Sequence, residues 1–283
     1  MSNLTTRIIS AVAFGSVFVS ALYFHFIGLW AFMLLLSVVA LYEFNKLFPQ
    51  SLFSFSLPVT FFLFVLAEQS ETLPLLINGH FSLNQITMLW LIILLIPVVG
   101  IAALLSRKKD KISAFTQTIT MILYCVVPFW LLVISSYWWK EVTNEYTGWV
   151  ALFFFFFLWI SDIGQYFSGR FFGKRKLFET LSPKKTVEGF VGGLLLAGAF
   201  GYAAHLMQPQ LFPDQLLSTI LGILLAATGT AGDLIESSFK RAAGVKDSGN
   251  LIPGHGGVLD RFDSTLFAAP IYFCYIQFQL AFF

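Results

Sequence analysis

Charged residues are scarce in this sequence: Lys, Arg, Asp and Glu make up 11% of its 283 residues, against about 25% in soluble domains. So few charges cannot cover a water-exposed surface, and the mean hydropathy is +0.79. This excludes a water-soluble globular enzyme and a disordered or fibrous chain.

Cysteine is also scarce. Cys125 and Cys274 both lie in apolar stretches without metal-site spacing, so we expect small buried hydrophobic side chains there.

Long apolar runs are abundant instead. Nine stretches approach the roughly 17–25 residues that a helix needs to cross a bilayer: 8–27, 29–47, 51–67, 86–105, 115–137, 148–168, 188–207, 214–236 and 264–283. The sequence therefore predicts an all-α, polytopic integral membrane protein with about nine transmembrane helices. We expect a single domain over 1–283, in which 1–150 supplies N-terminal transmembrane helices and 151–283 supplies catalytic helices and cytoplasmic loops. The stretch 51–67 contains Pro58, and a re-entrant segment is the alternative there.

The basic residues predict the orientation. With nine spans, 16 of the 17 Lys and Arg residues fall on the side of the N-terminus, and Lys140 alone falls on the other side. Because cytoplasmic loops carry an excess of Lys and Arg, the N-terminus is expected to be cytoplasmic. Two hairpin segments on that side, 161–189 and 228–264, hold 10 of the 17 basic and 8 of the 15 acidic residues. Simple connections between helices need no such composition, so we expect the chemistry there.

Carboxylates in these two segments predict a metal site. Asp233, Glu236 and Lys240 share one face of a helix, and a glycine-rich stretch at 254–257 precedes two further aspartates. Oxygen ligands of this kind suit Mg²⁺, and glycine N–H groups can hold anions. Asp233 and Asp260 are expected to share one divalent ion, with the others as further ligands or ligands of a second cation. For Glu236, and for Glu43, neutralisation by a basic neighbour is the alternative. The predicted metal ligands are Asp162, Asp233, Glu236, Asp260 and Asp263.

Basic residues beside these carboxylates predict a polyphosphate substrate, because charge neutralisation is what phosphoryl-type transfer needs. Asp233, Asp260, Lys240 and Arg241 are the predicted catalytic residues. Asp247 could hold a ribose or orient Lys246, and both alternatives stay open. For 174–176 the alternative is attraction to anionic lipid headgroups. The predicted substrate-binding residues are Arg170, Lys174, Ser182, Lys184, Lys185, Lys246, Asp247, His255, Gly256, Gly257 and Arg261.

One run within this region resembles a known signature: Ser237-Ser-Phe-Lys240-Arg241, four residues, Lys246-Asp247-Ser-Gly249, then Ile252-Pro253-Gly-His255-Gly256-Gly257-Val258-Leu-Asp260-Arg261-Phe262-Asp263. It is similar to the signature of the phosphatidate cytidylyltransferases, also called CDP-diacylglycerol synthases. Blocks at 161–174, 182–189 and 232–237 are also similar to that family. The specific resemblance covers roughly 160–264, whereas the first 150 residues match only as a set of apolar spans.

The resemblance implies a reaction. CTP and phosphatidate would give CDP-diacylglycerol and pyrophosphate, with Mg²⁺ as cofactor and K⁺ as a candidate second cation. It also implies an all-helical, often dimeric protein with a polar cavity that faces the cytoplasm and opens toward lipid. We therefore expect CTP, phosphatidate and membrane lipids as partners, a homodimer as a candidate assembly, no nucleic acid, and a multi-pass location in a bacterial-type inner (plasma) membrane. The identities of the nucleotide and the lipid come only from the resemblance.

Two other functions fit parts of this pattern. A CTP-dependent polyprenol or lipid kinase would also combine many spans, Mg²⁺ and basic cytoplasmic loops, but it would transfer the γ-phosphate. A transporter would also keep carboxylates in the membrane, with its site near the midplane. Here the charges gather at one interface, which favours the transferase.

Overall fold

The computed structural model describes residues 15–68, 99–106, 108–251 and 256–281. Its helices and strands are α2 (Phe26–Leu47), α3 (Phe53–Glu68), α5 (Lys111–Cys125), α6 (Val127–Thr143), α7 (Trp149–Phe172), β1 (Lys176–Phe178), β2 (Ser182–Thr186), α8 (Val187–Met207), α9 (Gln215–Ala242) and α10 (Leu259–Ala281). Residues 15–23 and 99–105 are also helical.

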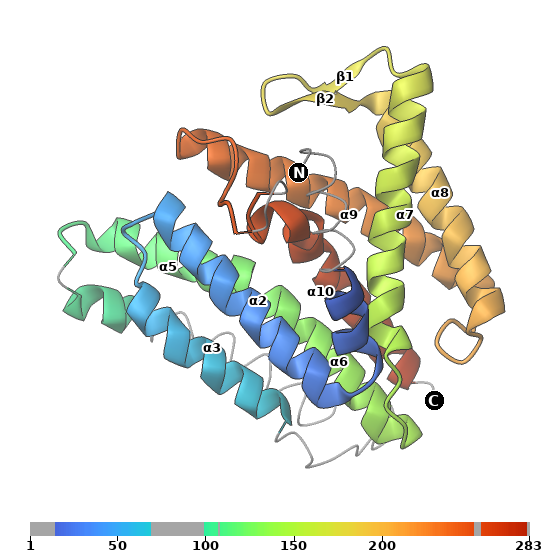
Figure 1. Cartoon of the computed structure of the whole chain (residues 1–283), viewed down its shortest axis with the longest axis horizontal. Helices are drawn as coiled ribbons and strands as arrows, with labels where there is room; N and C mark the ends of the chain where they lie inside the picture. Colours follow the sequence, from blue (N-terminus) through green and yellow to red (C-terminus); the bar gives the residue numbers. More distant parts are fainter. Residues whose placement is uncertain (1–14, 69–98, 107, 252–255, 282–283) are drawn as a thin grey trace, which may run out of the picture.

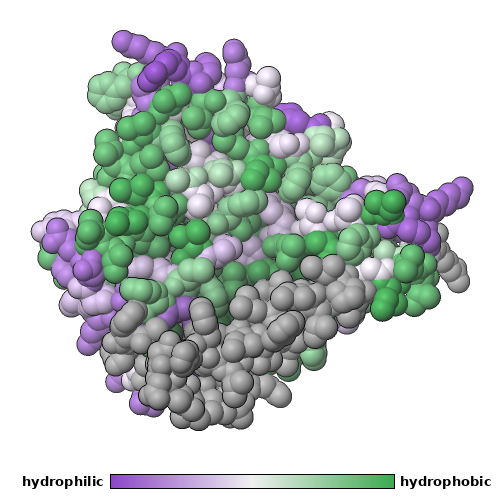
Figure 2. All heavy atoms as spheres, turned by 180° about the vertical axis from the view of Figure 1, so that it is seen from behind, coloured by the Kyte–Doolittle hydropathy of each residue, from purple (hydrophilic) through white to green (hydrophobic). Residues whose placement is uncertain are grey.

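Five helical stretches are long and apolar enough to cross a membrane: Phe26–Leu47, Lys111–Glu141, Trp149–Phe172, Val187–Met207 and Gln215–Ala242. They coincide with five of the predicted spans, and the prediction of an all-α membrane protein is confirmed at this level. The predicted spans 8–27 and 86–105 lie partly outside the described residues, so the total of nine stays a prediction. Figure 2 shows hydrophobic side chains over much of one face, with hydrophilic ones gathered at its margins. Such a surface suits contact with lipid.

Local sequence sets where several helices begin. Asp110 caps α5 by accepting a hydrogen bond from the Ser113 N–H (2.9 Å), and Asp214 caps α9 in the same way through the Leu217 N–H (2.7 Å). The predicted span 115–137 is divided between α5 and α6 at Val126, with a proline in the first turn of α6. A proline lacks the N–H that a continuous helix would need there.

Glycines allow the C-terminal helices to approach closely. A Cβ on Gly222 of α9 would lie 2.1 Å from the carbonyl oxygen of Ala197 in α8, and a Cβ on Gly164 of α7 would lie 2.8 Å from the carbonyl oxygen of Gly192. Small residues at such crossings bring helix backbones together in membrane proteins. Figure 1 accordingly shows α7 and α8 side by side, with α9 crossing near them.

A short hairpin joins α7 to α8, where the sequence indicated only a polar loop. Strands β1 and β2 pair antiparallel, with Lys176 opposite Thr186 and Phe178 opposite Ser182. The hairpin lies at one end of the α7–α8 pair (Figure 1). Among the remaining helices, α10 packs against both α9 and α6, and α2 packs against α6. The charged segments 161–189 and 228–264 thus meet at one end of these helices.

Candidate active site

A cavity of about 630 Å³, lined mostly by charged and polar residues, lies where α7, β2, α8, α9 and α10 meet. Fifteen residues line it, and fourteen of them come from the two charged segments. Eight of them are predicted site residues: Asp162, Arg170, Lys184, Lys185, Asp233, Asp260, Arg261 and Asp263. The cavity therefore brings together carboxylates and cations that lie up to 101 positions apart in the sequence (263 − 162).

Two close approaches shape this cavity. A Cβ on Gly232 of α9 would lie 2.5 Å from the carbonyl oxygen of Asp263 in α10, so only glycine allows these backbones to come so near. The side chain of Thr186 caps α8 by accepting from the Gly189 N–H (3.1 Å), and its Oγ1 would lie 3.1 Å from a Cβ on Gly169 of α7. The first approach sets Asp233 beside Asp263, and the second holds the end of β2 against α7.

Three carboxylates form a compact group at this cavity. Asp233, Glu236 and Asp263 each offer an oxygen, and these oxygens lie within 4.8 Å of one another. The Asp233 carboxylate forms an ion pair with Lys185, and the Glu236 carboxylate forms one through Oε2 with Lys240. Glu236 is 2% exposed, and no described residue donates a hydrogen bond to its Oε1. A buried carboxylate oxygen without a donor, beside two other carboxylates, fits a divalent cation with oxygen ligands.

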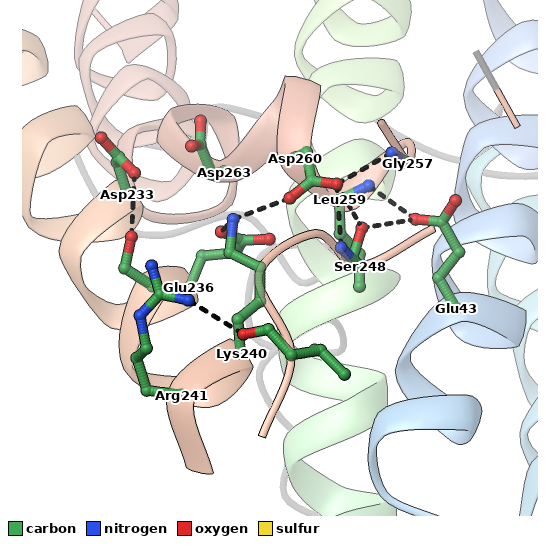
Figure 3. Close-up of polar contacts among 12 residues, drawn as sticks. Glu43, Asp233, Glu236, Lys240, Arg241, Ser248, Gly257, Leu259, Asp260 and Asp263 are labelled. Atoms are coloured by element: carbon green, nitrogen blue, oxygen red, sulfur yellow. Dashed lines mark hydrogen bonds and ion pairs between the residues drawn. The ribbon is translucent and has the colours of Figure 1, made fainter. Parts of the chain in front are cut away.

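Asp260 does not belong to this group of three, but it pairs with the same Lys240 ammonium as Glu236 (Figure 3). Its Oδ1 accepts from Lys240 Nζ (2.7 Å), and its Oδ2 accepts from the N–H and Oγ of Ser248 (2.9 and 3.0 Å) and from the Gly257 N–H (2.8 Å). The sequence paired Asp233 with Asp260, whereas the structure groups Asp233 with Glu236 and Asp263. The difference arises because Asp263 lies one turn further along α10, at the close approach to Gly232.

The glycine-rich turn before α10 faces carboxylates of the chain itself. The Gly257 N–H donates to Asp260. Gly256 has a φ of +88°, and a Cβ there would lie 2.7 Å from the Oδ2 of Asp260. The left-handed backbone and this near contact both require glycine at 256. His255 lies outside the described residues.

Other predicted site residues lie outside the lining of the cavity. Arg241 donates from its guanidinium to the Val245 carbonyl (2.9 Å) at the end of α9. The Lys174 N–H donates to Glu188 (3.0 Å), while Lys246 and Asp247 are exposed in the turn after α9. Ser182 begins β2, opposite Phe178. The predicted catalytic role of Arg241 and the predicted substrate-binding roles of the other four residues stay predictions.

Glu43 of α2 is the residue that the sequence did not place at this site. It is 3% exposed, and it accepts from the N–H groups of Val258 (3.0 Å, to Oε1) and Leu259 (2.9 Å, to Oε2). The Ser248 hydroxyl also lies 3.1 Å from Oε2, so Glu43 and Asp260 share its one proton. The donors to Glu43 are thus two N–H groups at a helix N-terminus and a hydroxyl. The alternative considered from the sequence was a basic side chain beside Glu43. The only sequence signal was an acidic residue inside the apolar stretch 29–47.

Comparison with known proteins assigns the family. The model of the cytidylyltransferase family matches residues 5–279. A phosphatidate cytidylyltransferase of Bacillus subtilis (strain 168) is 48% identical over 130 residues, which are 44% of this chain and 45% of that protein. One of Aquifex aeolicus (strain VF5) is 36% identical over 182 residues, 64% of each chain. One of Haemophilus influenzae (strain ATCC 51907 / DSM 11121 / KW20 / Rd) is 47% identical over 132 residues, 46% of each.

The chain spans about half the length of most of these curated relatives. The family model, in contrast, matches almost all of the described residues, including both segments that line the cavity. The resemblance found in the motif at 237–263 is thereby confirmed: the chain belongs to the cytidylyltransferase family.

Proposed function

We propose that the chain transfers CMP from CTP to phosphatidate, giving CDP-diacylglycerol and pyrophosphate for membrane phospholipid synthesis. The observation that carries this proposal is the cavity in which Asp233 and Asp263, two of the three clustered carboxylates, lie with the basic side chains of 170, 184, 185 and 261. A site for a metal–polyphosphate complex needs both kinds of group. The family assignment and the names of the relatives support the choice of nucleotide and lipid.

Asp233, Glu236 and Asp263 would hold Mg²⁺ in this proposal, because their oxygens converge and one of them has no donor among the described residues. Bound there, the divalent ion would offset the charge of the CTP phosphates and of the departing pyrophosphate. K⁺ is the candidate second cation, with Asp162 at the same cavity as a candidate ligand. Asp260 would share the Lys240 ammonium with Glu236 rather than serve as a first ligand.

The residues of the chain supply positioning and charge. An oxygen of the phosphatidate phosphate is already anionic, so no general base is required. It attacks the α-phosphorus of CTP, the bond from that phosphorus to the oxygen bridging to the β-phosphate breaks, and pyrophosphate leaves with that electron pair. Lys184, Lys185, Arg170 and Arg261 would hold the two polyanions close together and offset their repulsion.

The membrane arrangement belongs to the same proposal. The chain would cross a bacterial-type inner membrane nine times as a single domain, with its N-terminus and the cavity on the cytoplasmic side. The basic residues at the cavity support that orientation, because cytoplasmic segments are rich in Lys and Arg. CTP would reach the cavity from the cytoplasm and phosphatidate from the bilayer, and a homodimer is the proposed assembly.

Differently labelled CTP tests the reaction. The purified chain in detergent micelles is given phosphatidate, Mg²⁺ and CTP labelled either at the α- or at the γ-phosphorus. We expect α-label in the organic-extractable product and γ-label in water-soluble pyrophosphate, with no product when a chelator removes Mg²⁺. An Asp233→Asn variant serves as the negative control, and Glu141→Gln in α6 serves as a matched neutral change. Label from the γ-position in lipid, with none from the α-position, would instead identify a lipid kinase.

A further inference from the structure

Glu43 and Asp260 contact the same two parts of the chain, Ser248 and residues 257–259 at the start of α10. Glu43 projects from α2 and Asp260 lies in the first turn of α10, and Figure 3 shows both carboxylates directed at the segment around Ser248. The Ser248 Oγ lies 3.1 Å from Glu43 Oε2 and 3.0 Å from Asp260 Oδ2. The N–H groups of the next two residues after Gly257 donate to Glu43, while the Gly257 N–H donates to Asp260. The groups that donate to Glu43 are therefore the same as, or next to, those that donate to Asp260, so a displacement of one carboxylate would also move the donors of the other.

Glycines leave room for the Glu43 carboxylate. A Cβ on Gly249 would lie 2.6 Å from Glu43 Oε1, and a Cβ on Gly257 would lie 2.4 Å from Oε2. Both distances are shorter than any normal contact, so a side chain at either position would displace the carboxylate. Two glycines of the family motif, Gly249 and Gly257, thus lie against a carboxylate from a distant helix.

The contact continues toward the metal-binding group. Asp260 Oδ1 lies 2.7 Å from Lys240 Nζ, and the same ammonium pairs with Glu236. Since Lys240 is shared, the position of Asp260 decides how much of the ammonium charge remains for Glu236. If Asp260 moved away, Lys240 would neutralise Glu236 alone and would compete there with a divalent cation.

We propose that Glu43 is a positioning residue for the active site: it fixes the turn before α10, and through Ser248, Asp260 and Lys240 it keeps Glu236 available to a cation. The contact with the turn stands independently, whereas the effect on the cation rests on the proposed function. Glu43 lies outside the lining of the cavity, so it would act without touching substrate.

Hydrogen–deuterium exchange of the full chain in detergent tests the contact. Glu43→Gln keeps the size of the side chain but turns one acceptor oxygen into a donor that faces other donors. We expect amides in 248–260 to exchange at least about tenfold faster, because hydrogen bonds to a charged acceptor are lost, while α6 and α7 exchange as in the wild type. The control is Glu141→Gln in α6, whose carboxylate pairs with Lys140 at 3.7 Å. Unchanged exchange in 248–260, or an equal rise throughout the chain, would overturn the proposal.

A second measurement separates positioning from simple support of the fold. We expect Glu43→Gln to raise the Mg²⁺ concentration for half-maximal activity at least about tenfold, as loss of groups that orient metal ligands does elsewhere. A loss of folded protein would lower the rate without moving that concentration. Faster local exchange with an unchanged Mg²⁺ requirement would leave Glu43 as a structural residue only and would refute its positioning role.

Gly249→Ala tests the same contact by changing the glycine that lies against Glu43. It keeps the Glu43 carboxylate but places a Cβ against it, so we expect the same local rise in exchange and the same shift in Mg²⁺ requirement. This variant replaces Glu43→Gln if the latter does not fold. Exchange needs no substrate. A wild-type chain without cytidylyl transfer would therefore refute the proposed function, while the exchange result would still decide the contact of Glu43.

Discussion

Replacing Lys240 by methionine would remove the ammonium group that two buried carboxylates share. Lys240 is 9% exposed and pairs with Glu236 and, at 2.7 Å, with Asp260. Methionine keeps much of the length of the side chain, so the change removes charge more than volume. Glu236 and Asp260 then remain at the site without their common cation.

The structure indicates where the cost would fall. Asp260 would keep the N–H groups of Ser248 and Gly257 as donors, together with the Ser248 hydroxyl that it shares with Glu43. Glu236 would keep none among the described residues, since its Oε1 already has no donor. Leaving a buried charge without its partner costs about 3–5 kcal/mol. At roughly 2–4 °C per kcal/mol, the melting temperature should fall by about 6–20 °C.

Thermal unfolding of the purified chain in detergent, without divalent cations, measures this loss. The double variant Lys240→Met/Glu236→Gln should recover more than half of it, because the carboxylate without a donor is then neutral. Lys140→Met is the matched control. Lys140 is half-exposed and lies 3.7 Å from Glu141, so it should lower stability by no more than about 1 kcal/mol.

Two results would refute this reasoning. If Lys240→Met had the same melting temperature as the Lys140→Met control, the Lys240 ammonium would not be compensating the charge of buried carboxylates. If the double variant were no more stable than the single one, the cost would not reside in Glu236, and the lost packing of the lysine stem would be the better explanation.

Three further predictions concern the site and the topology. Asp233→Asn should lower cytidylyl transfer at least about 10²-fold, the scale of one strong electrostatic contact in a transition state, while the chain stays folded in the melting assay. Gly232→Ala should lower both activity and melting temperature, because its Cβ would lie 2.5 Å from the Asp263 carbonyl oxygen and would separate α9 from α10; wild-type values would contradict that close approach. A reporter fused after Phe283 should read as external and one inserted in 106–114 as cytoplasmic, and a cytoplasmic reading for both would mean that the number of spans is not odd.

Contacts within one helix could be predicted from the sequence. The spacing of Glu236 and Lys240 places them one turn apart on the same face, and the structure contains that ion pair. The apolar runs predicted membrane-spanning helices because the length of a run can be counted along the sequence and compared with the thickness of a bilayer. The five stretches that are long enough coincide with predicted spans.

Contacts between helices could not be predicted in this way. Whether Asp263 or Asp260 lies beside Asp233 depends on how α9 and α10 cross. Gly232 allows the observed crossing, but a glycine in the sequence does not predict which helix will approach it. The short hairpin of β1 and β2 likewise depends on register, in a segment too short and too polar to carry a strand pattern.

The sequence by itself determined the class of the protein and its family, because composition, the length of apolar runs and a dense motif can all be read along the chain. It also predicted the segments in which we expect the chemistry. The tertiary structure alone decided which carboxylates meet. Ser248 is 205 positions from Glu43, and Leu259 is 216 positions from it, yet both donate to the same carboxylate. No periodicity connects positions so far apart. Only the packing of α2 beside the start of α10 brings a buried acceptor to the Ser248 hydroxyl and to the Leu259 N–H at the helix N-terminus.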